Sequence, residues 1–303
     1  GIERSCLTKP ALLDKMGAQA MNNNSKTKSS SFRDTYGPWA VVAGGSTGLG
    51  AAYVRELAAR GVNVVAIARS ADRLAELKEQ CERDFGVQVR TIGLDLLSAT
   101  AFDEVAAATS DIEVGLLVYN AAFPNAGGYL EKTVAQQRSV VTLNCMRPME
   151  LSHHFAAQMR GRGRGGIVLM SSLTAFNGSP YISNYGASKA FNLILGEGLG
   201  YELAKIGVNV TVCCAGVITT PNFEEGFSGK ASLIEPPKMT PEEVARLALG
   251  ALGRKNVIVP GSMNSFLSFI MRKIMSRRAA VRLMAKTVED LSIEERQSEQ
   301  EVP

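Results

Sequence analysis

The sequence has few of the residues that bind metals or form disulfide frameworks. It contains only two histidines, the adjacent His153 and His154. Neighbouring residues on a helix point about 100° apart, which is poor geometry for gripping one metal ion. The five cysteines show no CxxC spacing, and an odd number cannot be fully paired within one chain. These shortages argue against a metal site and against a disulfide scaffold, and they favour the reducing cytoplasm.

Long apolar runs are also missing. No uninterrupted apolar stretch approaches the roughly 18 residues typical of a membrane-spanning helix, and the N-terminus has no apolar signal-peptide core. The net charge of +4 is spread along the chain except for one basic cluster near the C-terminus. No broad basic face for nucleic acid is therefore indicated. We expect a soluble cytoplasmic protein without a nucleic-acid partner.

The chain changes character near Trp39. Residues 1–36 are poor in apolar side chains and predict a flexible N-terminal extension. Short apolar runs follow and predict strands at 39–44, 62–68, 87–92, 114–119, 166–171, 208–214 and 256–260. Between them, helices are predicted at 49–60, 71–84, 100–108, 133–160, 186–205 and 241–253. Strands that are apolar throughout are buried on both faces. The pattern predicts a single α/β domain over 37–262, a doubly wound parallel sheet of about seven strands with helices on both faces.

The C-terminal part carries two further signals. Thr240, Pro241 and Glu243 form the pattern of a capped helix start. Residues 263–288 combine apolar and basic side chains at near-helical spacing, namely Phe266, Ile270, Ile274, Val281 and Met284 beside Arg272, Lys273, Arg277, Arg278 and Arg282. Such a segment either caps a substrate cleft or lies on an acidic membrane surface, and we favour the cap. A polar, mostly acidic tail follows at 289–303.

A glycine-rich turn joins the first predicted strand to the first long helix. Glycine permits a tight turn and lets the backbone approach a diphosphate, while the helix N-terminus supplies free N–H donors. Its position in a βαβ unit strengthens this interpretation. The residues predicted to hold the diphosphate are Gly44, Ser46, Thr47, Gly48, Leu49 and Gly50.

The end of the second predicted strand indicates which dinucleotide binds. NAD enzymes tend to place an acidic residue there for the ribose hydroxyls, and this chain has none. Arg69 instead suits the extra phosphate of NADP, with Ser70 as a second donor. We therefore predict NADP(H) as the cofactor.

These motifs resemble the short-chain dehydrogenase/reductase family over roughly residues 37–262. The turn AGGSTGLG is similar to that family's TGxxxGxG, and the resemblance implies further cofactor contacts after the later strands. The implied contacts are Asp95, Leu96, Asn120, Ala121, Ala122, Gly216, Val217 and Thr220.

The same resemblance implies a catalytic set. Tyr185 and Lys189 supply the family's YxxxK signature, and Ser172 precedes Tyr185 by 13 residues, which favours it over Ser171. Asn144 falls where the family keeps an Asn that holds a water linking the lysine to solvent. Tyr185 and Lys189 are four residues apart and share one helix face. A phenol of pKa near 10 acts as general acid in reduction and as base in oxidation when a neighbouring ammonium favours the phenolate. Ser172 would stabilise charge on the carbonyl oxygen.

We therefore expect an NADP(H)-dependent oxidoreductase that reduces a hydrophobic ketone, a steroid or a 3-oxoacyl substrate. The alternative is a catalytically idle NADP(H)-binding regulatory protein on the same fold. A second alternative within the enzymes is the extended, epimerase-like branch of the family, which has a different glycine spacing. The family commonly pairs its long helices, which implies a homodimer or homotetramer. The aromatic residues Phe123, Phe176, Tyr181 and Phe223 are candidates to line the substrate cleft.

Overall fold

The computed structural model describes residues 31–219 and 238–286. The chain divides into two compact units, Gly1–Ser31 and Phe32–Pro303, and the second carries all of the elements below. Nearly all of the predicted extension and the whole predicted tail 289–303 lie outside the described residues. The seven strands form one parallel sheet in the order β3-β2-β1-β4-β5-β6-β7, which confirms the predicted fold class. Their bounds are β1 Trp39–Ala43, β2 Asn63–Ala68, β3 Val89–Gly93, β4 Val114–Tyr119, β5 Gly165–Ser172, β6 Val208–Ala215 and β7 Val257–Ile258.

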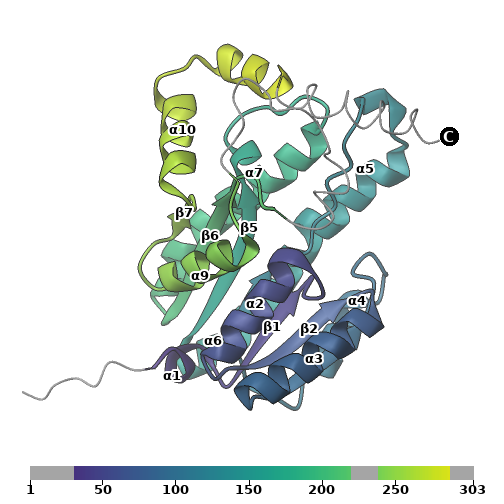
Figure 1. The fold of residues 1–303 in the computed structure, drawn as a ribbon, viewed down its shortest axis with the longest axis vertical. Helices are drawn as coiled ribbons and strands as arrows, with labels where there is room; N and C mark the ends of the chain where they lie inside the picture. Colours follow the sequence, from purple (N-terminus) through teal and green to yellow (C-terminus); the bar gives the residue numbers. More distant parts are fainter. Residues whose placement is uncertain (1–30, 220–237, 287–303) are drawn as a thin grey trace, which may run out of the picture. The chain divides into compact units, whose positions relative to one another are not determined.

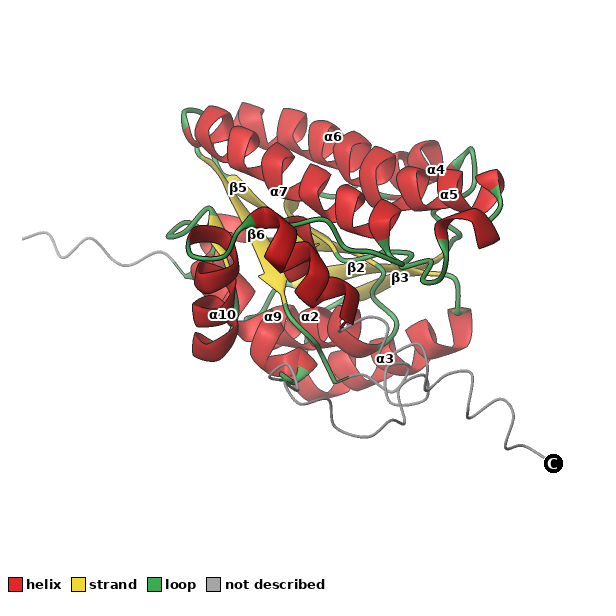
Figure 2. Ribbon diagram, turned by 90° about the horizontal axis from the view of Figure 1, so that it is seen from above, coloured by secondary structure: helices red, strands yellow, loops and turns green. Residues whose placement is uncertain are grey.

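Helices cover both faces of this sheet (Figure 2). One face carries α2 (Gly48–Ala59), α3 (Ala71–Phe85) and α9 (Pro241–Ala251), and the other carries α4 (Ala101–Ala108), α5 (Val134–Val141), α6 (Arg147–Arg162) and α7 (Ser183–Ala204). Every residue of β4 is buried, as expected for a parallel strand between two helix layers. Separate apolar cores fill the two sides, with Tyr53 buried in one and Phe155 in the other. Full burial of such an aromatic side chain contributes about 1.5–3 kcal/mol.

The predicted helix starts and ends lie within a few residues of the observed ones, with one exception. The helix expected over 133–160 is interrupted by a five-residue π-helical turn, Thr142–Met146, between α5 and α6. Such turns are rare and occur frequently at functional sites. The predicted start of α9 is confirmed, because Thr240 and Glu243 form a capping box and Pro241 occupies the first turn.

Two segments at the margins differ from expectation. Phe32–Tyr36, which the sequence assigns to the flexible extension, forms the short helix α1, and Tyr36 is buried. The Tyr36 hydroxyl accepts a hydrogen bond from the Asn209 side chain at 3.0 Å, so tertiary contacts outweigh the polar composition of this segment. Strand β7 is only two residues long, because only Val212 and Cys213 of β6 pair with it.

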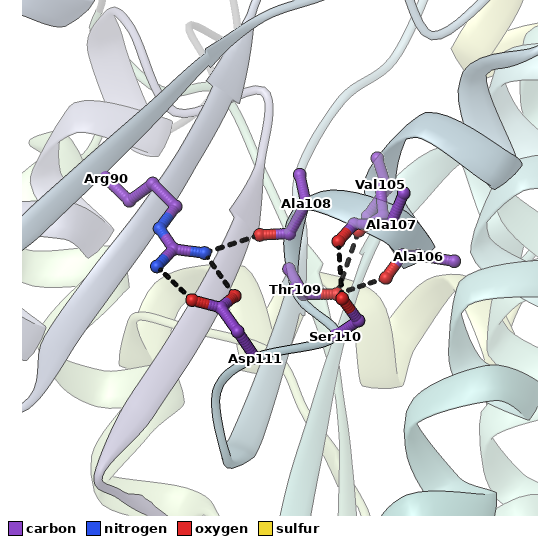
Figure 3. Close-up of polar contacts among 8 residues, drawn as sticks. All are labelled: Arg90, Val105, Ala106, Ala107, Ala108, Thr109, Ser110 and Asp111. Carbon is purple, nitrogen blue, oxygen red and sulfur yellow. Dashed lines mark hydrogen bonds and ion pairs between the residues drawn. The ribbon is translucent and has the colours of Figure 1, made fainter.

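Side chains close the C-terminal end of α4 and tie it to β3 (Figure 3). Arg90 on β3 donates to both carboxylate oxygens of Asp111 at 2.7 and 2.9 Å and to the Ala108 carbonyl at 2.6 Å. The Thr109 hydroxyl donates to the Val105 carbonyl at 2.8 Å. The ion pair holds the pKa of the Asp111 carboxyl below its usual value. These bonds satisfy carbonyls that the last helical turn leaves unpaired.

The predicted C-terminal segment forms two helical pieces. Helix α10 covers Ser262–Lys273, and residues 277–286 form a second helical stretch. Figure 1 shows α10 beside β7, at the edge of the sheet. The polar residues Asn264 and Ser268 of α10 are buried, whereas Phe266 and Ile274 are exposed. These two apolar side chains are more than half exposed, and the cap expected from the sequence stays a prediction.

Candidate active site

A cleft of about 800 Å³ opens at the carboxyl ends of the strands. It lies where the strand order reverses, between β1 and β4. In open parallel sheets, ligands bind in the crevice at this switch point. The cleft is lined both by the glycine turn after β1 and by residues after β4, β5 and β6.

The glycine turn is packed too tightly for larger residues. Gly44 has a φ of +80°, and a Cβ there would lie 2.8 Å from the Ala121 backbone. A Cβ on Gly50 would lie 1.8 Å from the Gly44 carbonyl oxygen. That carbonyl accepts a hydrogen bond from the Asn120 side-chain amide at 3.0 Å. Gly44 lines the cleft, whereas Gly50 lies behind it and allows α2 to approach the turn.

The first backbone N–H groups of two helices on this side of the cleft are not capped by a side chain. Thr47 is the N-cap of α2 and Ser70 is the N-cap of α3, and neither side chain makes a capping hydrogen bond. Both residues line the cleft, together with Ser46, Gly48 and Leu49. A helix N-terminus presents free N–H groups and a positive dipole end, which together favour a phosphate. The residues present therefore fit the diphosphate of a dinucleotide.

Two guanidinium groups stand at the end of β2. Arg69 and Arg73 both line the cleft and are exposed. Neither takes part in an ion pair with any acidic group among residues 31–219 and 238–286. Arg73 was not predicted from the sequence, although its spacing of four residues from Arg69 was a usable signal. Unpaired guanidinium groups suit a phosphate monoester.

The segment after β3 is fixed by a buried arginine. Asp95 and Leu96 line the cleft as predicted, and Asp95 Oδ1 accepts a hydrogen bond from the Leu97 amide at 3.0 Å. Arg147, a buried residue of α6, donates to the Leu96 carbonyl at 2.9 Å and to the Ser98 carbonyl. The position of this segment therefore depends on a side chain that the sequence did not single out.

Three of the four predicted catalytic side chains meet in the cleft. Ser172 ends β5, and Tyr185 and Lys189 lie on α7; all three line the cleft. The Tyr185 hydroxyl forms a hydrogen bond with the Ser172 side chain. Lys189 Nζ donates to the Met170 carbonyl at 3.0 Å and lies 5.5 Å from the centroid of the Tyr185 ring.

Burial shifts the pKa of both ionisable groups toward their neutral forms. Burial raises the pKa of Tyr185 to about 12, and the hydrogen bond from Ser172 opposes that shift. Burial lowers the pKa of Lys189 to about 8. Strongly shifted groups in a cleft are typical of functional sites. In the cleft as it stands, Tyr185 is a protonated phenol at neutral pH and is able to donate its proton.

The two neighbouring serines have different surroundings. Ser171 is buried, and its hydroxyl donates to the backbone carbonyl of Lys189 at 2.7 Å. Ser172 is less buried, and its hydroxyl accepts from the Thr174 amide at 3.2 Å as well as contacting Tyr185. The Ser172 hydroxyl faces Tyr185, in line with the spacing argument, whereas Ser171 bonds the backbone of the helix that carries Lys189.

Asn144 lies in the π-helical turn and outside the cleft lining. It is fully buried, and its amide group bonds to both the N–H and the carbonyl of Phe123, at 2.9 and 3.2 Å. The same amide donates to Ser188 Oγ at 2.9 Å, and the Asn144 carbonyl accepts from Asn192 at 2.9 Å. In this geometry, Asn144 ties the loop after β4 to α7.

The remaining predicted contacts divide into three groups. Asn120, Ala121, Ala122 and Gly216 line the cleft, and so does the candidate aromatic residue Phe123. Val217 is absent from the lining, and its carbonyl accepts from the Met239 amide at 3.1 Å. Thr220 and Phe223 lie outside the described residues. The lining also includes residues with no sequence signal, namely Leu97, Gln136, Ser139, Leu143, Met170 and Ile218.

Fold and site together define a dinucleotide-binding oxidoreductase. Residues 38–231 match the family model of short chain dehydrogenases. The chain therefore belongs to the short-chain dehydrogenase/reductase family, and it transfers hydride between a nicotinamide and a carbonyl or hydroxyl group.

Relatives show which branch the chain resembles. It is 29% identical to the 7β-hydroxysteroid dehydrogenase of Clostridium sardiniense, over 77% of this chain and 89% of the relative. A solved structure from work on 7β-hydroxysteroid dehydrogenase stereoselectivity is 26% identical, with a TM-score of 0.79 over 84% of this chain and 99% of the other. A short-chain dehydrogenase from Sphingobium yanoikuyae, solved in complex with NADPH, is 26% identical with a TM-score of 0.66, over 79% and 97% of the two chains.

No helix among the described residues is long and apolar enough to cross a membrane.

Proposed function

We propose that this protein is an NADP(H)-dependent reductase of bulky hydrophobic ketones. The observation that carries the cofactor preference is the pair of unpaired guanidinium groups, Arg69 and Arg73, at the end of β2, where no acidic residue lines the cleft. An acid at this place would repel a third phosphate, whereas guanidinium groups form charge-assisted hydrogen bonds with one. The similar enzyme solved with NADPH supports the same choice.

The roles of the cleft residues follow from their geometry. When bound, a nicotinamide dinucleotide supplies or accepts the hydride. Tyr185 donates a proton to the substrate oxygen during reduction, and Ser172 gives that oxygen a hydrogen bond as negative charge develops on it. Lys189 holds positive charge beneath the Tyr185 ring, which favours the phenolate left behind by proton transfer. Asn144 keeps the loop after β4 in place through Phe123.

The proposed substrate class rests on the apolar part of the lining. Phe123, Leu143, Met170 and Ile218 line the same cleft as Ser172, Tyr185 and Lys189. These apolar side chains beside the hydroxyl groups of Ser172 and Tyr185 suit a ring system or an acyl chain that carries one carbonyl. The similarity to hydroxysteroid dehydrogenases supports a steroid-sized ketone.

Residues 277–286 form part of this proposal as a cap on the substrate side. Ala280 is fully buried, and Val281 lies so near Gly178 that a Cβ there would be 3.4 Å from its side chain. Arg272 stacks over the Phe176 ring at 4.3 Å. The contacts of Arg272 on α10 and of Val281 in residues 277–286 lead to residues 176–178, which follow the strand that carries Ser172.

We also propose a homodimer or homotetramer built through α6 and α7. On α7, Leu193 is buried in the core, while Ile194 is exposed. Phe191, Tyr201 and Met149 are further exposed apolar residues on these helices. Exposed apolar patches on helices commonly mark interfaces. The cytoplasm remains the proposed compartment, in line with four free cysteines among the described residues.

A cofactor-consumption screen tests this function. The full-length protein is mixed with NADPH and with ketones of three classes, namely steroids, 3-oxoacyl esters and small aliphatic ketones. We expect oxidation of NADPH with the bulky classes and little with the small ones. Saturable NADPH binding without turnover of any ketone or alcohol would support the catalytically idle alternative instead.

A further inference from the structure

Helix α10 buries two polar side chains and exposes several apolar ones, unlike an ordinary surface helix. Asn264 and Ser268 face the protein and are 1% and 4% exposed. The apolar side chains at helical spacing point outward, with exposures of 54% for Met263, 58% for Phe266 and 55% for Phe269. Ile274, just after the helix, is 68% exposed. A surface helix normally buries its apolar stripe. The exposed side chains of α10 therefore indicate a binding surface for a partner outside the described part of this chain.

The inward polar face accounts for the orientation of the helix. Asn264 Nδ2 donates to the Pro260 carbonyl at 3.2 Å, and its side chain lies so close to Gly216 that a Cβ there would be 2.9 Å from it. Rotating α10 to bury Phe266 would expose Asn264 and place an aromatic ring against the backbone of a cleft residue. The apolar stripe is therefore held outward by the packing of the catalytic domain.

The charge around this stripe has one sign. Residues 262–286 contain no Asp or Glu and six basic residues, namely Arg272, Lys273, Arg277, Arg278, Arg282 and Lys286. Beside the helix, a second cavity of about 360 Å³ is lined by the basic residues Lys255, Arg272 and Lys273 and by apolar residues that include Phe269 of the stripe. Positive charges thus border the exposed apolar side chains both along the chain and across to β7.

We propose that α10 docks this enzyme on the surface of an anionic lipid bilayer. Met263, Phe266, Phe269 and Ile274 enter the boundary between headgroups and acyl chains, and the surrounding Arg and Lys side chains contact lipid phosphates. An apolar face flanked by basic residues is the pattern of helices that lie in a membrane interface, and each basic residue near an anionic surface adds attraction. Binding is peripheral, since α10 has only 12 residues and is too short to span a bilayer.

Charge decides between a bilayer and a second copy of this chain. A two-fold contact between copies brings the same patch of each copy together. The six basic residues of one copy would then face the same six of the other, and residues 262–286 contain no acidic residue to pair with them. Charged residues are also depleted at the centre of protein interfaces. A bilayer rich in anionic lipid complements both the apolar and the basic parts of the patch.

Co-sedimentation of the full-length protein with vesicles tests the proposal. We expect pelleting with phosphatidylcholine vesicles that contain phosphatidylglycerol, little pelleting with phosphatidylcholine alone, and release by high salt. The double variant Phe266→Ser/Phe269→Ser should lose about tenfold in partitioning, and so should Lys255→Gln/Lys273→Gln, which removes two exposed charges beside the stripe. Leu130→Ser is the control, because Leu130 is 95% exposed and lies outside residues 262–286. This variant should pellet like the wild type.

Two further measurements distinguish the competing outcomes. Circular dichroism and turnover of a water-dispersed ketone should be unchanged in both double variants, since none of the four positions lines the cleft. Wild-type protein that stays in the supernatant with anionic vesicles would overturn the proposal. A change in oligomeric state of Phe266→Ser/Phe269→Ser, measured by light scattering without vesicles, would overturn it too and would assign the stripe to contacts between copies.

Discussion

Lys189 and Tyr185 are coupled through one face of α7, with the ammonium 5.5 Å from the centre of the phenol ring. Lys189 is also anchored by the Met170 carbonyl at 3.0 Å, so the charge stays beneath the ring. Burial raises the pKa of Tyr185 to about 12 and lowers that of Lys189 to about 8. The pair is therefore poised with the phenol protonated and with a lysine able to change charge near physiological pH.

Replacing Tyr185 by Phe tests the proton donor. The variant keeps the ring and deletes the transferable proton, so steady-state ketone reduction should fall by about 10²- to 10⁴-fold. NADPH affinity, measured by fluorescence titration, should stay close to the wild-type value. Tyr201→Phe is a matched control, because that residue is on the same helix and is exposed. Near-normal reduction by Tyr185→Phe would mean that another group supplies the proton.

The pH dependence of stability tests the buried state of Lys189. Its folded pKa of about 8 lies below its ordinary value of 10.5, so the unfolded chain binds more protons between these two values. Burial of the charged Lys189 therefore lowers the free energy of unfolding. This effect is complete below pH 8 and weakens as the pH rises toward 10.5.

Urea unfolding of the wild type and Lys189→Met measures this contribution. We expect the free energy of unfolding of the wild type to rise relative to the variant between pH 8 and 10.5. The comparison removes the opposite effect of Tyr185, whose raised pKa lowers stability above pH 10 in both proteins. A constant difference across this range would show that Lys189 titrates normally in the folded state.

The sequence predicts the sheet well because its strands are buried on both faces. Runs such as that of β4 are continuously apolar and only about six residues long, which is typical of a strand buried on both faces. Ser172, Tyr185 and Lys189 were equally predictable from the sequence, because their residue types and spacing resemble the signature of the family. The glycine turn is predictable because glycine permits a tight turn. The structure agrees, since a Cβ at Gly50 would overlap the Gly44 carbonyl.

Other features depend on contacts between distant segments and leave no local signal. In the π-helical turn, the Asn144 amide bonds the backbone of Phe123, 21 residues earlier in the chain. Arg147 reads as a solvated helix residue, yet it is buried against the Leu96 carbonyl. The outward stripe of α10 follows from the fit of Asn264 against Gly216, which no periodicity reveals.

The tight turn before α2 predicts a strong effect of one methyl group. Gly50→Ala places a Cβ 1.8 Å from the Gly44 oxygen, so the turn must open. We expect a loss of about 1–3 kcal/mol in the free energy of unfolding and a weaker affinity for NADPH. Gly250→Ala is the matched control, since it lies in α9 with nothing within 4 Å of its added Cβ. Equal stability and equal NADPH affinity for the two variants would contradict the packing described for Gly50.

The last prediction concerns the arginine pair at the end of β2. If both guanidinium groups hold the 2′-phosphate, Arg69→Ala and Arg73→Ala should each weaken NADPH by about 1.5–3 kcal/mol, or roughly ten- to a hundredfold. Affinity for NADH, which lacks this phosphate, should hardly change. The two residues are one helical turn apart and share one phosphate in this proposal, so the double variant should lose less than the sum of the single losses.

Isothermal titration of NADPH and NADH into the four proteins measures each step of this cycle. Arg246→Ala, which removes an exposed charge on α9 outside the cleft lining, controls for the change in net charge. Raising the salt concentration should reduce the difference between wild type and variants, because charge-assisted bonds at an exposed site are screened. Equal losses for NADPH and NADH in Arg69→Ala would place the extra phosphate elsewhere, and a loss confined to Arg69→Ala would leave Arg73 as a solvated residue at the rim. The proposed preference for NADPH can thus be measured at two side chains, separately from the proton transfer proposed for Tyr185.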